Sequence, residues 1–190
     1  MSEKRKQQAK LLRNFRSIHR TLGALLFVFF FVVSITALLL GWKKNSGNLI
    51  LPSTKMGATT TINNWLPMEQ LQDIAFNVLK DSVSSSINLD LDRIDSRPSK
   101  GVVKFVFKEH YWGVQLDGAT GKVLSLSPRR ADVIENIHDG SILDVVFKTN
   151  SNILKLIYSS VMSISLLLFT VTGFWLWYGP KRMRKSKRTP

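Results

Sequence analysis

The longest uncharged stretch of the sequence constrains the fold more than any other feature. Leu22 to Trp42 contains no charged residue. At about 1.5 Å per residue, a helix over this stretch is roughly 30 Å long, which matches the hydrocarbon core of a bilayer. A second uncharged stretch, Leu156 to Tyr178, is also long enough to span. The sequence therefore predicts two transmembrane helices, over residues 22–42 and 151–178, with the lipid bilayer as a partner.

The net charge of +14 is concentrated at the two ends of the chain. Residues 1–21 and 179–190 are rich in Lys and Arg and contain a single acid, Glu3, whereas residues 43–150 are nearly balanced in charge. The positive-inside rule then predicts a cytoplasmic N-terminal segment over 1–21, a cytoplasmic tail over 179–190 and an external middle region. The same distribution explains the basic composition without a nucleic-acid partner, and none is expected.

The sequence argues against signal-peptide cleavage, against cysteine chemistry and against a hydrolase site. The stretch around Leu40-Gly41-Trp42-Lys43-Lys44 has no small-x-small cleavage site, so the first apolar stretch is expected to remain as an anchor. The chain has no cysteine, which excludes disulfides, thiolate nucleophiles and Cys-ligated metals. No nucleophile-elbow motif is present, and carboxylate pairs such as Asp90 and Asp92 are interpreted as solvated polar groups.

The middle region has the pattern of a small α+β domain over residues 43–130. We expect a linker over Lys43–Asn64 and then a helix over Met68–Lys80, with one apolar face formed by Met68, Leu71, Ile74, Ala75, Val78 and Leu79. Alternating residues predict strands over Ile87–Leu91, Val102–Phe107, Trp112–Leu116 and Lys122–Leu126. A juxtamembrane segment over 131–150 is expected to hold one helix, Ala131–Phe147. The predicted fold class is therefore a two-span α-helical membrane protein with an inserted α+β domain.

The turn before the last predicted strand carries the first family resemblance. Asp117 can accept hydrogen bonds from backbone amides of the turn, and Gly121 permits a positive φ where the chain reverses. The stretch Val114-Gln115-Leu116-Asp117-Gly118-Ala119-Thr120-Gly121-Lys122-Val123-Leu124, after a helix and alternating strands, resembles the end of a PepSY domain. This motif is structural, and we assign it no chemistry.

Two further motifs resemble those of PepSY-associated transmembrane proteins. Arg16-Ser17-Ile18-His19-Arg20-Thr21-Leu22-Gly23 is similar to the start of their first helix, and Ile137-His138-Asp139-Gly140-Ser141-Ile142 is similar to a His-x-Gly signature before a later helix. That helix ends with Thr-Gly and an aromatic residue, as in Thr172-Gly173-Phe174. This chain departs from the pattern at Thr36-Ala37, where Thr-Gly is usual, and it has one two-span unit where well-studied relatives have four or more spans.

The resemblance implies a function in electron transfer. Larger members resemble bacterial inner-membrane ferric-siderophore reductases, which bind haem b through histidines on their spans. Carried onto this chain, it implies that His19 and His138 are haem iron ligands, that the middle domain is periplasmic and that an iron chelate or a protein binds on the outer side. A transmembrane oxidoreductase component is one hypothesis. The alternatives are a non-redox, membrane-anchored module that binds an extracytoplasmic peptidase or other partner, and an accessory subunit of a larger complex.

The histidines have competing interpretations. His19 is either a haem ligand or an interfacial anchor between Arg16 and Arg20, and His138 is either a ligand or a capping residue. His110, near a hairpin, is expected to be exposed to solvent. Because His19 and His138 lie at opposite ends of a span, roughly 30 Å apart, they cannot share one haem. In a two-fold homodimer, each histidine would instead meet its own copy.

Small residues on the two spans predict where helices approach closely. Gly23, Ser34, Ala37 and Gly41 share a stripe with His19 at about 100° per residue, and Ser159, Ser163 and Gly173 lie on the second span. We expect these residues to be helix-packing positions. The basic pair Arg129-Arg130 is expected to meet a lipid headgroup or a haem propionate.

Overall fold

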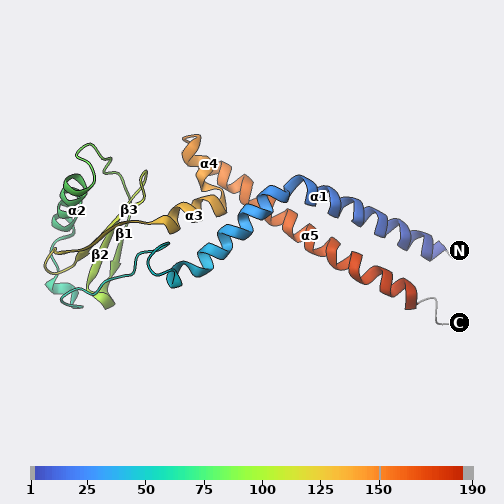
Figure 1. Cartoon of the computed structure of the whole chain (residues 1–190), viewed down its shortest axis with the longest axis horizontal. Coiled ribbons are helices and arrows are strands. Elements are labelled where there is room, and N and C mark those ends of the chain that lie inside the picture. Colours follow the sequence, from blue (N-terminus) through green and yellow to red (C-terminus); the bar gives the residue numbers. More distant parts are fainter. Residues whose placement is uncertain (1–2, 150, 186–190) are drawn as a thin grey trace. The chain divides into compact units, whose positions relative to one another are not determined.

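The computed structural model describes residues 3–149 and 151–185, and these form two compact units. One unit is residues 38–135, and the other contains the described residues before 38 and after 135. Parts of three predicted segments lie outside the described residues, namely 1–2, 150 and 186–190. Figure 1 shows the order of the elements along the chain.

Two long helices, α1 (Glu3–Trp42) and α5 (Ile153–Lys185), contain the two apolar stretches. Both are long and apolar enough to cross a membrane. Only 11% of the most apolar window of each helix is buried within the chain, so these helices are not packed as the core of the described structure. Leu25 and Leu167, for example, are 72% and 65% exposed.

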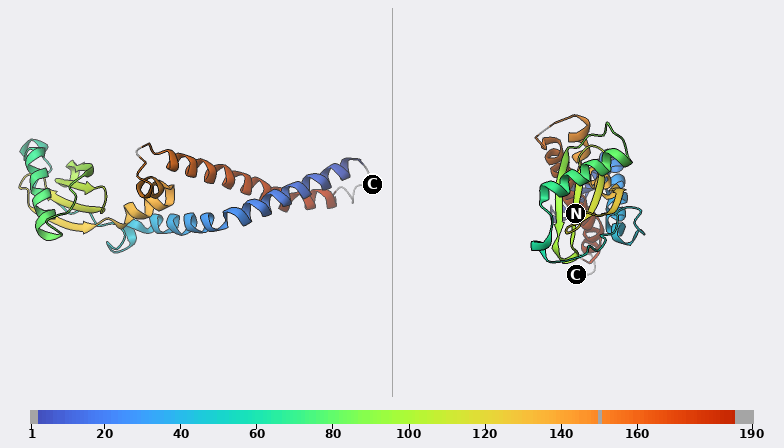
Figure 2. Two further views of the ribbon diagram at one scale, coloured as in Figure 1. Left: turned by 90° about the horizontal axis from the view of Figure 1, so that it is seen from above. Right: turned by 90° about the vertical axis from the view of Figure 1, so that its left-hand side faces the viewer.

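α1 and α5 run in opposite directions and cross each other (Figures 1 and 2). The ring centroids of Phe15 and Trp175 are 6.2 Å apart, and those of Phe30 and Phe169 are 5.7 Å apart. The contacting residues of α1 are spaced mainly by three, four or seven positions, which places them on one side of the helix. The residues of α1 that contact α5 are Leu12, Phe15, His19, Gly23 and Phe30.

The packing face departs from the predicted small-residue stripe in its second half. Ser34, Ala37 and Gly41 are exposed, and a Cβ added to Gly41 would have no neighbour within 4 Å. α1 and α5 cross rather than pack along their full length, so a stripe along α1 does not follow the contact throughout (Figure 1). The described structure therefore leaves these three predicted packing positions exposed.

Of the packing positions predicted on α5, one is exposed and two make contacts. Ser163 is exposed, whereas Ser159 donates to the carbonyl oxygen of Asp139 at 2.9 Å. Gly173 and Gly23 do lie at close approaches. A Cβ on Gly173 would be 3.3 Å from His19 Cε1, and one on Gly23 would be 3.2 Å from Phe169.

The segment before α5 forms two short helices, α3 (Arg130–Asp139) and α4 (Ser141–Val146), so the single predicted helix is wrong. Gly140 separates them with a φ of +82°, a conformation that a β-carbon disfavours. Asp144 then accepts hydrogen bonds from the N–H groups of Leu154 and Lys155 in the first turn of α5. The hydroxyl of Thr149 and these amides hold the pKa of Asp144 below its usual value, against the opposing effect of burial.

The other unit contains a four-stranded antiparallel sheet of order β1-β2-β3-β4. The strands are β1 (Leu91–Arg97), β2 (Val102–Phe107), β3 (Trp112–Asp117) and β4 (Val123–Pro128). Helix α2 (Met68–Ser82) covers one face (Figure 2). The core between them consists of Leu71, Ala75, Leu79, Val103, Phe105, Phe107, Val114 and Leu116. The helix face is as predicted except that Met68 is 41% exposed and Phe76 packs against the core.

The predicted strand over Ile87–Leu91 is wrong, because the first strand begins where it was expected to end. Ile87 and Leu89 do pack against the core, which explains their alternation with polar residues. They belong to a loop, in which the side chain of Asn88 accepts a hydrogen bond from the N–H of Asp90 at 2.9 Å. β1 itself carries charged residues along its length, which protects an edge strand from pairing with another chain.

The predicted linker is instead a strap, residues 50–61, that crosses the second face of the sheet. Gln115 accepts a hydrogen bond from the N–H of Lys55 at 3.2 Å and donates to the carbonyl of Ser53 at 3.0 Å. The strap also approaches the β1–β2 turn, where the N–H of Gly57 donates to the carbonyl of Lys100 at 2.8 Å. Single 3₁₀ turns, Lys43–Asn45, Ile62–Asn64 and Pro98–Lys100, complete the described structure of this unit.

Candidate functional site

His19 lies in a slot between α1 and α5. Its ring stacks on Phe169 with centroids 3.8 Å apart and an interplanar angle of 25°. Gly173 borders the ring on the Cε1 side. His19 Nδ1 is 2.9 Å from Thr172 Oγ1, so both halves of the Thr172-Gly173 pair contact this histidine.

The hydrogen bonds of Thr172 indicate which nitrogen of His19 carries the proton. The Thr172 hydroxyl donates to the carbonyl of Leu168 at 2.7 Å, a common bond for threonine within a helix. A hydroxyl has one hydrogen, so its oxygen then accepts from the imidazole. This arrangement assigns the proton to Nδ1 and leaves the lone pair on Nε2 in the neutral ring. Among the described residues, none forms a hydrogen bond to Nε2 of His19.

His138, in α3, repeats this arrangement with α1. Its Nδ1 is 2.9 Å from Thr36 Oγ1, and the Thr36 hydroxyl donates to the carbonyl of Val32 at 2.8 Å. The same reasoning assigns the proton of neutral His138 to Nδ1. Nε2 has no hydrogen-bond partner within the part of the chain that the structure describes. Thr36 belongs to the Thr36-Ala37 pair, where the family pattern has Thr-Gly. The threonine of the pattern is present, and it contacts His138.

A cavity of about 280 Å³ adjoins His138. It is lined mainly by apolar side chains of α1 and α5, including Phe30, Val33, Met162 and Leu166. The lining also includes the polar residues Asp139, Ser159 and Ser163. An apolar surface beside an imidazole is the kind of environment that binds a flat, largely apolar cofactor. We call the His19–Thr172 and His138–Thr36 contacts the two His–Thr pairs.

The two His–Thr pairs are far apart. His19 and Thr36 both belong to α1 and are separated by 17 residues of continuous helix, which corresponds to about 25 Å. Within residues 3–149 and 151–185, no group of three or more His, Asp or Glu side chains is arranged to hold a metal ion. Each histidine would therefore serve a separate site, as the sequence analysis predicted.

His110 differs from the other two histidines because both of its ring nitrogens are used. Nε2 is 2.8 Å from the carbonyl oxygen of Asn88, and Nδ1 accepts from the N–H of Trp112 at 3.2 Å. The ring is half-buried and lies beside Phe107, so the prediction of a solvent-exposed residue is wrong. These bonds connect the loop before β1 to the β2–β3 hairpin, and His110 has a structural role.

The Asp117 turn is confirmed in detail. Asp117 Oδ1 accepts from the N–H groups of Ala119 and Thr120 at 2.9 and 3.2 Å, and Gly121 has a φ of +70°. Asp117 Oδ2 also accepts from Ala58 of the strap at 2.7 Å, a contact that the sequence analysis missed. Burial opposes ionisation of this carboxyl, but the backbone donors outweigh it and lower the pKa of Asp117.

The threonine partners were quoted in the family motifs, but no role was inferred for them. The only sign of a role in the sequence is that each threonine is a polar residue within an apolar stretch. Its partner depends on how the helices are paired, which the sequence does not specify. No protein family, curated protein or solved structure matches this chain in a systematic comparison.

Proposed function

We propose that this chain is a two-span inner-membrane protein of the PepSY-associated transmembrane type that binds haem b and transfers electrons across the membrane. The observation that carries the proposal is a pair of histidines, each with Nδ1 held by a threonine and with no hydrogen bond to Nε2 from any described residue. A ring anchored through Nδ1–H is the usual arrangement for a histidine that ligates a metal through Nε2.

The membrane part of the proposal rests on α1 and α5 and on the charges beside them. Both helices have exposed apolar surfaces and are long enough to span. The basic ends of the chain favour cytoplasmic termini and an external, periplasmic location for the domain within residues 43–130.

His19 and His138 fit a haem iron because the porphyrin itself supplies the equatorial nitrogens, so a protein need add only axial ligands. Haem b, when bound, supplies a reversible one-electron couple. Thr172 and Thr36 would hold the imidazole rings in one orientation and, by accepting from Nδ1–H, make Nε2 a better electron donor. Apolar side chains beside His138 would exclude water from that site.

A second copy of the chain, or a larger complex, would complete each site. One chain supplies one histidine at each end of the helix pair, and a two-fold axis would bring each histidine to its own copy. Ser34, Ala37 and Gly41 are exposed on α1 and offer a surface of small side chains to another helix. The proposed path takes electrons from a cytoplasmic donor to an iron chelate or other acceptor outside.

The proposal is tested by an optical spectrum of the full chain purified in detergent from haem-replete cells. We expect a Soret band and a reducible α-band of the b type. His19→Ala and His138→Ala should each remove part of the signal. A colourless wild-type preparation would refute haem binding.

A second function, a non-redox module that binds an external partner, is favoured by a basic cavity in the domain of residues 38–135. In that case the histidines would be structural. A partner that co-purifies with the chain and is retained by both histidine variants would support this alternative.

A further inference from the structure

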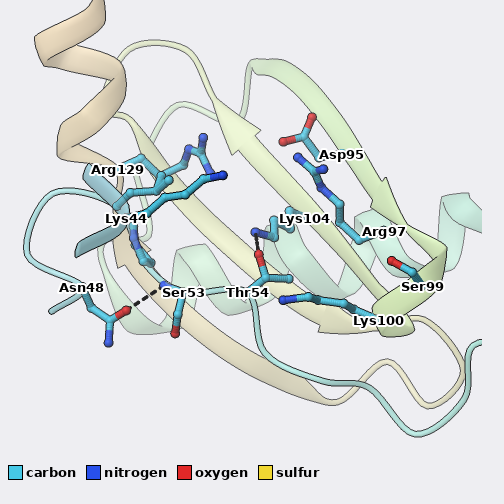
Figure 3. Close-up of a pocket in the computed structure, with 12 residues that line it drawn as sticks. Lys44, Asn48, Ser53, Thr54, Asp95, Arg97, Ser99, Lys100, Lys104 and Arg129 are labelled. Atoms are coloured by element: carbon cyan, nitrogen blue, oxygen red, sulfur yellow. Dashed lines mark hydrogen bonds between the residues drawn. The ribbon is translucent and has the colours of Figure 1, made fainter. Parts of the chain in front are cut away.

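A cavity of about 470 Å³ lies beside the strap, on the face of the sheet opposite α2 (Figure 3). Its lining is strongly basic. It contains five cationic side chains and one carboxylate, namely Lys44, Arg97, Lys100, Lys104, Arg129 and Asp95. In Figure 3 the amino group of Lys104 lies in the middle of this group, with Arg129 and Lys44 on one side and Arg97 and Lys100 on the other.

Lys104 is the most unusual residue of the cavity, because it is a buried cation without a counter-ion. It is 7% exposed in the middle of β2, and its Nζ donates to Thr54 Oγ1 at 2.5 Å. Among the described residues, no carboxylate oxygen lies within 4.0 Å of this Nζ. Buried charges are normally paired, since removing an ion from water is costly. Burial, together with the nearby charges of Arg129 and Arg97, lowers the pKa of Lys104.

Arg129 is held over the sheet by specific contacts. Its Nε and Nη2 donate to the two carboxylate oxygens of Asp132 at 2.7 and 3.1 Å. Gly113 makes room for the side chain, because a Cβ there would be 2.9 Å from Arg129 Cδ. This positions Arg129 beside the cavity, but its charge is already balanced by Asp132.

The remaining cations of the cavity have no ion-pair partner among the described residues. Arg97, Lys100 and Lys44 are exposed, and none of the three forms an ion pair with any residue that the structure describes. Asp95 is the cross-strand neighbour of Lys104 in the sheet register but forms no ion pair with it. The Asp95 carboxylate lies 3.7 Å from Nε of Arg93, a residue that does not line the cavity. The cavity therefore has an excess of positive charge around a buried amino group.

We propose that this cavity binds a multiply charged oxyanion of the phosphate type. Lysine and arginine both bind phosphate, and a cavity lined by low-dielectric protein strengthens the attraction. The hydroxyl groups of Ser53 and Thr54 line the same space and add hydrogen-bonding capacity. The volume leaves room for an organic group attached to the anion.

Two sources can supply this chemistry. One is the headgroup of an anionic phospholipid, because Lys44 follows the last residue of the first apolar stretch by only two positions. The other is a soluble phosphate compound. The inference does not depend on the histidines, because every residue of the cavity belongs to the unit of residues 38–135.

The test is calorimetric titration of the full chain in an uncharged detergent with inorganic phosphate and with pyrophosphate. We expect saturable binding that Lys104→Gln weakens by about tenfold or more. Lys122→Gln is the matched control, because Lys122 is an exposed lysine of the same unit that does not line the cavity. Its binding should equal that of wild type.

A second measurement separates loss of binding from loss of folding. Lys104→Gln removes an uncompensated buried charge, so the thermal midpoint of the ligand-free variant should be equal to or above that of wild type. If Lys104→Gln does not fold, the same affinity measurement is made with Arg97→Gln and with Lys100→Gln, which replace exposed cations of the cavity.

Adding phosphatidylglycerol to the micelles distinguishes the two sources. A lipid source predicts that the lipid displaces inorganic phosphate, and a soluble source predicts unchanged phosphate affinity. The proposal is overturned if neither anion shows saturable binding up to about 10 mM in the absence of lipid. It is equally overturned if binding is unchanged in every cavity variant that folds.

Discussion

Thr172 and Thr36 are the residues whose chemistry matters most for the proposed haem sites. Each hydroxyl is committed to a carbonyl of its own helix, which leaves its oxygen to accept from histidine Nδ1–H. His110 lacks this arrangement, because both of its nitrogens are bonded to the backbone. The three histidines are thus separated into two candidate ligands and one structural residue by their hydrogen bonds alone.

Replacing Thr172 tests this role without changing a proposed ligand. Thr172→Val removes the acceptor oxygen and keeps the side-chain shape, so haem affinity at the His19 site should fall by about 10- to 100-fold. Thr172→Ser should restore most of it. The measurement is haem titration of the apoprotein in a His138→Ala background, followed by absorbance.

Thr170→Val is the matched control. Thr170 also donates to a carbonyl of α5, at 2.8 Å, but it is exposed and does not contact His19. Equal haem affinity in Thr172→Val and wild type would contradict the role assigned to Thr172.

Asp117 gives a prediction for pH. Its pKa is lowered in the folded state, so its contribution to stability is present above the unfolded value of about 3.9 and is lost as the pH falls below that value. Asp117→Asn should cost about 1–2 kcal/mol at neutral pH. The thermal midpoint of Asp117→Asn should also fall less than that of wild type when the pH is lowered from about 5 to about 3. These two pH values lie on either side of the unfolded pKa of about 3.9.

The comparison is made by thermal unfolding of the full chain, monitored by tryptophan fluorescence. Trp65 reports on this region because it packs against Gly118 in the same turn. Asp81→Asn, at the exposed end of α2, should leave the pH profile unchanged. A wild-type pH profile in Asp117→Asn would show that the turn does not depend on this carboxylate.

At the scale of elements, Gly140 connects α3 to α4 and sets where α3 ends. Its φ of +82° and its contact with Tyr158 both oppose a side chain. Gly140→Ala should therefore lower stability by more than the 1–2 kcal/mol or so expected from backbone strain alone. It should also weaken the His138–Thr36 bond, because His138 lies two residues before it.

Gly47→Ala is the control for strain. Gly47 has a φ of +59°, but a Cβ there would have no neighbour within 4 Å. Thermal unfolding of both variants separates backbone strain from the clash with Tyr158. Equal losses of stability in Gly47→Ala and Gly140→Ala would mean that the clash with Tyr158 adds nothing to the effect of backbone strain.

The sheet illustrates how far sequence patterns reach. β2 has the predicted bounds and β3 extends one residue further, because a run of buried residues beside a Gly-containing turn identifies a strand locally. The strap was missed because its contacts with Gln115 and Asp117 join residues about sixty positions apart. The Ser- and Thr-rich composition of the strap is the same as that of a solvated linker, so composition alone does not distinguish them.

The helix pair illustrates a different difficulty. The positions of the two apolar stretches and of both histidines follow from the sequence, but the contact face does not. The sequence does not specify the register at which α1 crosses α5, and Ser34, Ala37 and Gly41, which were expected at the interface, are exposed. The His–Thr pairs depend on that register and were therefore not predicted.

At the scale of the whole molecule, the central proposal is that two copies of the chain bind one haem at each His–Thr position. The haem-to-chain ratio of the purified dimer tests it most directly. We expect about one haem per chain in wild type and about half that ratio in His19→Ala and in His138→Ala. The double variant should contain none, and His110→Ala should bind as wild type does. Wild-type haem content in the double variant, or its absence from the wild-type chain, would contradict the proposal.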